Sequence, residues 1–117
     1  MKNTVVYIEH DEKKYPLVFN LNVMEEIQDR YGSLDKWGEL TKGEGEPKIK
    51  ELKTGIMLMI NEAIDIENEN NNTNNPMLTE KQVGRLMTNV GIDVIVKKIQ
   101  EITIASAKSE DNTGKNE

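Results

Sequence analysis

The spacing of apolar residues changes once along the chain, close to residue 22, and this change constrains the fold more than any other feature. Before it, apolar side chains occupy every second position, in the set Tyr15, Leu17, Phe19 and Leu21. Such alternation is typical of a strand with one face towards a core. After it, apolar residues recur at intervals of three or four, which is typical of amphipathic helices. The sequence therefore predicts strands at the N-terminus and helices in the rest of the chain.

Two strand segments joined by a polar connection predict a short N-terminal β-hairpin. Residues 4–8 read Thr-Val-Val-Tyr-Ile, which are β-branched and aromatic residues that strands favour. Residues 9–14 are polar, and the second strand is expected at 15–19. Because Pro16 has no N–H to donate to a ladder, we expect this strand to begin at Pro16 or to lie on an edge.

Capping signals and helical spacing predict three main α-helices after the hairpin. The first is expected to start at Asn22, with Glu25 completing a capping box, and to end before Gly32. A short turn carrying Trp37 follows, and a long helix is expected to start near Pro47. The last helical part starts with a second capping box at residues 79–82 and is interrupted at Gly91. The predicted fold is a small, mostly helical α+β domain.

Two segments lack the apolar residues that a core requires. Residues 67–76 contain six Asn among ten residues and are predicted to form a flexible loop. Residues 108–117 contain no apolar residue and are predicted to form a disordered C-terminal tail. The single domain is therefore expected to span residues 1–107.

Composition and charge exclude several classes of protein. The 117 residues include 15 Lys and Arg against 21 Asp and Glu, which gives a net charge of −6 and argues against a nucleic-acid partner. Cysteine is absent, so disulfide scaffolds and thiolate sites are excluded. No apolar stretch approaches the roughly 20 residues of a membrane span, and the N-terminus lacks a signal-peptide pattern. We expect a cytoplasmic protein with no membrane partner.

Reactive side chains are too sparse in the sequence to predict an enzyme, a cofactor or a metal site. His10 is the only histidine, and its neighbours in the polar connection are charged, which favours a solvent-exposed side chain. A small enzyme using carboxylates such as Glu62 and Asp65 is kept as an alternative, and it would need a concave pocket lined by these groups.

An apolar groove that receives a partner is the remaining functional hypothesis. Six Met residues and one Trp are available, and Met side chains adapt to irregular partners. The residues expected to contribute to such a groove are Trp37, Met57, Met59 and Met87. Packing in the core is the more ordinary interpretation of the same residues, and both interpretations remain open.

Several stretches of the chain resemble one known family. Residues 14–27 read Lys-Tyr-Pro-Leu-Val-Phe-Asn-Leu-Asn-Val-Met-Glu-Glu-Ile, and residues 31–34 read Tyr-Gly-Ser-Leu. The later stretches 58–63 (Leu-Met-Ile-Asn-Glu-Ala) and 78–84 (Leu-Thr-Glu-Lys-Gln-Val-Gly) add to the similarity. Over residues 13–103 the chain resembles the tail assembly chaperones of long-tailed bacteriophages and of prophages in Gram-positive bacteria.

The resemblance implies a non-enzymatic protein that coats the tape-measure protein and keeps it soluble until tail-tube subunits polymerise around it. In this family a longer, frameshifted form often recruits the tail-tube protein, and a homo-oligomer is also compatible with the resemblance. A DNA-associated regulatory protein of a mobile element is the alternative function.

Overall fold

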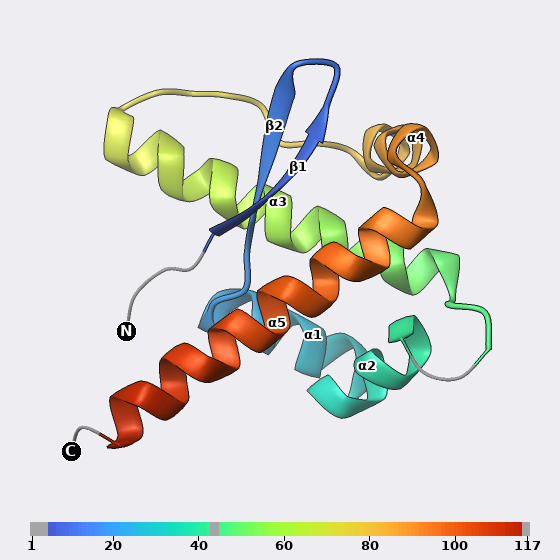
Figure 1. Cartoon of the computed structure of the whole chain (residues 1–117). Coiled ribbons are helices and arrows are strands. Elements are labelled where there is room, and N and C mark those ends of the chain that lie inside the picture. Colours follow the sequence, from blue (N-terminus) through green and yellow to red (C-terminus); the bar gives the residue numbers. More distant parts are fainter. Residues whose placement is uncertain (1–4, 43–44, 116–117) are drawn as a thin grey trace.

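A two-stranded antiparallel hairpin followed by helices makes up the fold (Figure 1). The computed structural model describes residues 5–42 and 45–115, without the side chains of residues 42 and 107–115. Over this range the elements are β1 (Val5–His10), β2 (Lys13–Val18), α1 (Leu21–Tyr31), α2 (Leu34–Lys42), α3 (Ile49–Asn71), α4 (Glu80–Val90) and α5 (Ile92–Lys115). The predicted class, a mostly helical α+β fold that opens with a hairpin, is confirmed.

The hairpin is tighter than the sequence suggested. Its register runs from the pair Val5 and Val18 to the pair His10 and Lys13. Asp11 and Glu12 form the turn with φ angles of 51° and 64°, a left-handed geometry that matches the twist of paired strands. The predicted polar connection at 9–14 is therefore wrong, because four of its residues belong to the strands. Pro16 lies on an edge, as expected, since both strands of a two-stranded sheet are edges.

The start of α1 lies two residues earlier than predicted. Asn20 is the N-cap, and its Oδ1 accepts a hydrogen bond of 3.2 Å from the Val23 N–H. Asn22 has another role, because its amide donates to Glu62 Oε2 at 3.0 Å, as the Asn20 amide does at 2.8 Å. The prediction of Asn22 as the cap is thus wrong. The second predicted capping box, between Thr79 and Gln82, is confirmed at α4.

Helix α3 continues into the Asn-rich segment instead of ending before it. It runs to Asn71, and Asn72 ends it in the left-handed conformation. Asn68 then organises the turn: its Oδ1 accepts from the Thr73 hydroxyl at 2.9 Å and from the Asn75 N–H at 3.0 Å. The expected loop at 67–76 is therefore helical over residues 67–71, and the N–H groups of Asn72 and Thr73 close the helix end on the Asn68 carbonyl oxygen.

The core lies where the hairpin meets the helices. β2 packs on α3, and β1 packs on α4 and α5, so that the hairpin lies between α3 and α5 (Figure 1). Helix α2 is a full helix where only a short turn was expected, and it buries Trp37. The largest fully buried side chains are Trp37, Ile8, Leu17, Ile27, Leu52, Ile56, Met59, Ile60, Ile95, Ile99, Ile102 and Val83.

The helical part contains more helices than the three predicted. α2 is one addition, and the interruption expected at Gly91 separates α4 from α5, with a φ of 103° at that glycine. The backbone of α5 runs to Lys115. The side chains of the predicted tail at 108–117 lie outside the described residues, so its disorder stays a prediction. Among the described helices, none is long and apolar enough to cross a membrane.

Candidate partner-binding site

The four residues expected to line a groove lie in or against the core. Met59 and Met87 are buried, Trp37 is only 2% exposed, and the half-buried Met57 packs against the core cluster. All four side chains are engaged in packing, and their contribution to a partner-binding groove stays a prediction. Parts of Trp37 and Met87 do border two separate open pockets.

The larger of these two pockets lies where the start of α3, the outer side of α4 and the start of α5 meet. It encloses about 640 Å³, and we call it the basic pocket. Its lining residues are Ile49, Lys53, Lys81, Gly84, Arg85, Met87, Thr88, Gly91 and Ile92.

The sequence of α4 explains how the pocket forms. Val83, Leu86 and Met87 are buried on the inner side of the helix, while Lys81 and Arg85, four residues apart, lie together on the outer side. Gly84 between them has no side chain to occupy the space. The Lys53 side chain of α3 lies nearby, since a Cβ placed on Gly84 would be 3.4 Å from Lys53 Cδ.

The pocket combines positive charge with apolar surface. Lys53, Lys81 and Arg85 line it, and no acidic residue is among its described lining residues. None of these three cations forms an ion pair with another residue of the described ranges. Ile49 adds an apolar side chain that is 53% exposed. In a chain of net charge −6, this local excess of positive charge is suited to an anionic partner with apolar groups.

Gly84→Ala is expected to raise the free energy of unfolding by about 1 kcal/mol, because Gly is a poor helix former and Ala the best. The added Cβ would only be in ordinary contact with the flexible Lys53 side chain, at 3.4 Å. Urea denaturation followed by circular dichroism measures this change. A loss of stability would contradict the open geometry described for this side of α4.

A third pocket, about 370 Å³ in volume, lies between α1 and α3 and is acidic. Glu25, Glu26, Glu62 and Asp65 line it, so the concave site required by the carboxylate-enzyme alternative is present. Glu62, however, has a structural role, because its Oε2 accepts both amide hydrogen bonds from Asn20 and Asn22. The enzymatic alternative stays an untested prediction.

The described residues offer no cluster of metal ligands. No group of three or more His, Asp or Glu there could hold a metal ion. His10 ends β1, and its Nε2 lies 3.3 Å from a carboxylate oxygen of Asp11, with the imidazole partly rather than fully exposed.

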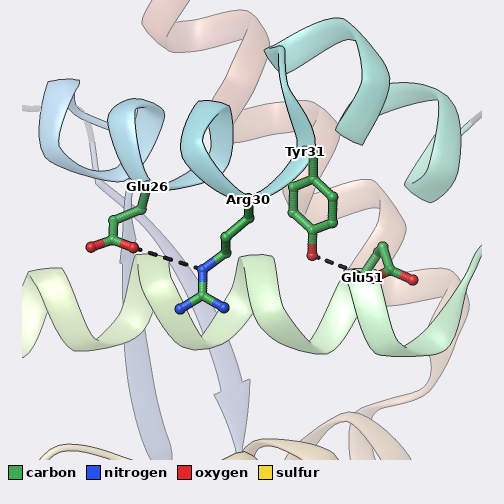
Figure 2. A network of polar contacts seen from close by, with 4 residues as sticks. All are labelled: Glu26, Arg30, Tyr31 and Glu51. Atoms are coloured by element: carbon green, nitrogen blue, oxygen red, sulfur yellow. Dashed lines mark hydrogen bonds and ion pairs between the residues drawn. The ribbon is translucent and has the colours of Figure 1, made fainter.

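Glu51 on α3 joins α1 and α2 to the long helix. The Tyr31 hydroxyl donates to Glu51 Oε1 at 3.4 Å, beside the Glu26–Arg30 ion pair of α1 (Figure 2). The Trp37 Nε1–H donates to the Glu51 carbonyl oxygen at 3.1 Å. Burial is the main cause that raises the pKa of Tyr31 above its ordinary value of 10.0, and the Glu51 carboxylate adds to this effect.

Tyr31 is expected to ionise above the ordinary tyrosine pKa of 10.0 as the pH rises. Because its folded-state pKa is raised, its contribution to stability is complete below the unfolded-state pKa, near 10. That contribution is lost as the pH rises through the folded-state pKa. A titration of phenolate absorbance should show this late step in the wild type and lack it in Tyr31→Phe. If the late ionisation step persists in Tyr31→Phe, it belongs to another tyrosine.

The basic pocket contains residues that sequence reasoning did not bring together. Lys81, Arg85 and Gly84 were visible as neighbours in one helix, and the like charges four residues apart were the available signal. Ile49 and Lys53 lie some 30 residues earlier in the chain, and only the packing of α3 against α4 places them beside that helix.

Comparison with known proteins does not identify the function of this site. Comparisons with family models, with curated proteins and with solved structures find no match to this chain. A functional assignment therefore depends on the residues quoted for the family resemblance and on the surfaces described above.

Proposed function

We propose that this chain is a non-enzymatic tail assembly chaperone of a long-tailed bacteriophage or prophage, acting in the cytoplasm of the bacterial host. It binds the tape-measure protein and keeps it soluble during tail assembly. The resemblance over residues 13–103 supports this proposal. The structural observation that carries it is the basic pocket, an open surface with apolar groups that a partner's side chains can enter.

The mechanism is the covering of an apolar face. A tape-measure segment is a long amphipathic helix, and its uncovered apolar stripe promotes self-association. A small domain that binds along the stripe shields it from other copies. The net charge of −6 then makes coated complexes repel one another and remain dispersed. In the same proposal, a longer form of the chain recruits the tail-tube protein, and several copies coat one partner as a homo-oligomer.

Co-expression with the tape-measure protein encoded near this gene tests the proposal. We expect most of the tape-measure protein in the soluble fraction when this chain is present and in the pellet when it is absent. An unrelated acidic protein of similar size serves as the control for a general effect of expression. Equal solubility with this chain and with the control would contradict the chaperone assignment.

The DNA-associated regulator remains the second candidate, because Lys53, Lys81 and Arg85 gather at one surface without ion pairs among the described residues. Phosphate contacts by these cations would give binding that weakens steeply with salt. A mobility shift of duplex DNA at low salt that disappears on addition of salt would favour this function.

A further inference from the structure

We infer that the basic pocket is the docking site for an amphipathic helix that carries acidic residues beside its apolar stripe. This inference deepens the proposed function, on which it rests, by naming the binding surface and the chemistry of the partner. It is carried by three features of the pocket: its apolar floor, its glycine, and its cations, which form no ion pair with the described residues.

The apolar floor requires a partner with apolar side chains. Met87 is buried beneath the pocket, Ile92 is half-buried at its edge, and Ile49 is exposed to solvent in the absence of a partner. Covering Ile49 and filling the pocket removes apolar surface from water, which favours binding. A free anion or a phosphodiester backbone gains nothing from this apolar surface.

The cations require acidic groups beside those apolar side chains. Lys81 and Arg85 lie on one side of α4, and Lys53 reaches the pocket from α3. The like charges at Lys81 and Arg85 repel each other, and carboxylates placed between them relieve this repulsion. On a partner helix, acidic residues three or four positions apart lie on one side of the apolar stripe and can meet these cations together.

Gly84 allows the partner to come close. It lies between Lys81 and Arg85 in sequence, and in the described structure its missing Cβ faces only the movable Lys53 side chain. Glycine costs about 1 kcal/mol relative to alanine in a helix, and no packing contact of the described residues requires it here. A surface without a side chain permits close approach of a bound backbone.

A designed peptide pair tests the inference directly. The acidic peptide, of about 20 residues, has Leu at helical spacing and Glu on the flanking positions, and the matched peptide has Lys in place of every Glu. Fluorescence anisotropy of the labelled peptides is measured against the full chain at low and high salt. We expect the acidic peptide to bind, the basic peptide not to bind, and the affinity to fall as salt is raised.

Charge-reversal variants locate the site. Lys81→Glu combined with Arg85→Glu is expected to weaken binding of the acidic peptide by about tenfold or more. The matched control is Lys36→Glu combined with Lys97→Glu, which makes the same change of charge at exposed positions of α2 and α5 and should leave binding unchanged. Gly84→Leu fills the pocket without changing charge and should also weaken binding. Circular dichroism of each variant verifies that the fold is retained.

Several results would overturn the inference. Equal binding of the two peptides, or equal weakening by both pairs of charge reversals, would show that the pocket is not the site. Displacement of the peptide by duplex DNA, with loss of DNA binding in Lys81→Glu/Arg85→Glu, would assign the pocket to nucleic acid. Self-association that is lost in the same variant, without peptide binding, would assign it to a second copy of the chain.

The same variants separate this inference from the proposed function. If the wild-type chain and Lys81→Glu/Arg85→Glu solubilise the tape-measure protein equally, the chaperone proposal holds and the pocket assignment fails. If the wild-type chain binds the acidic peptide but does not solubilise the tape-measure protein, the pocket assignment holds for another partner and the chaperone proposal fails.

Discussion

Trp37→Ala is expected to lower the free energy of unfolding by about 3–5 kcal/mol, as truncation of a large buried aromatic residue does. Trp37 is 2% exposed and heads the fully buried side chains by volume. Its loss leaves a cavity between α2 and α3 and removes the hydrogen bond to the Glu51 carbonyl oxygen. Because it is the only Trp in the chain, unfolding of the variant is followed by circular dichroism in urea.

Trp37→Phe is the matched control for this substitution. Phe keeps an aromatic ring in the core but has no N–H to donate to Glu51, so we expect a smaller loss of stability than with Ala. A loss below about 1 kcal/mol in Trp37→Ala would contradict the buried position of the indole. It would instead support the interpretation of Trp37 as a residue of a partner-binding groove.

Gly55→Ala is expected to destabilise the protein by about 1–3 kcal/mol, the usual cost of overpacking a core. A Cβ on Gly55 would overlap Cζ2 of the Trp37 indole, so either the indole or α2 must move. This steric cost exceeds the gain of about 1 kcal/mol that Ala brings to a helix. The effect is the opposite of that expected for Gly84→Ala, although both glycines lie inside helices.

A double-mutant cycle tests whether the Trp37 indole is the cause of the destabilisation by Gly55→Ala. In the Trp37→Ala background the indole is absent, so Gly55→Ala should no longer destabilise and should gain up to about 1 kcal/mol from helix propensity. Urea denaturation of the four proteins measures the coupling. If Gly55→Ala has the same effect in both backgrounds, the close contact between α2 and α3 is not the reason for the glycine.

Local signals predicted the parts of the fold that depend on neighbours in sequence. The alternation before residue 20 gave the hairpin, and the Thr79–Gln82 box gave the start of α4, because both depend on residues a few positions apart. The cap of α1 could not be predicted in this way. Asn20 and Asn22 are both good caps, and Glu62, about 40 residues later, holds the amides of both.

The candidate site was harder to predict than the fold because it depends on residues that lie far apart in the sequence. Apolar Met and Trp residues suit a core and a binding groove equally well, and the contacts of Trp37 with Gly55 and Glu51 decide for the core. The basic pocket depends on α3 bringing Ile49 and Lys53 to α4. The charge pattern along the chain did not reveal this surface, because Lys53 and Lys81 have the acidic neighbours Glu51 and Glu80 in sequence, neither of which lines the pocket.

The position of β1 has a consequence for folding during synthesis. β1 packs against α4 and α5, and the buried side of the hairpin includes Ile8 and Leu17. The ribosome makes the hairpin before the helices but must add more than 80 residues before Ile102, the last buried residue among the described side chains of α5, is available. At 5–20 residues per second this takes on the order of ten seconds. Until then β1 lacks its contacts with α4 and α5, while β2 can pack on α3 once residues 49–71 have been made.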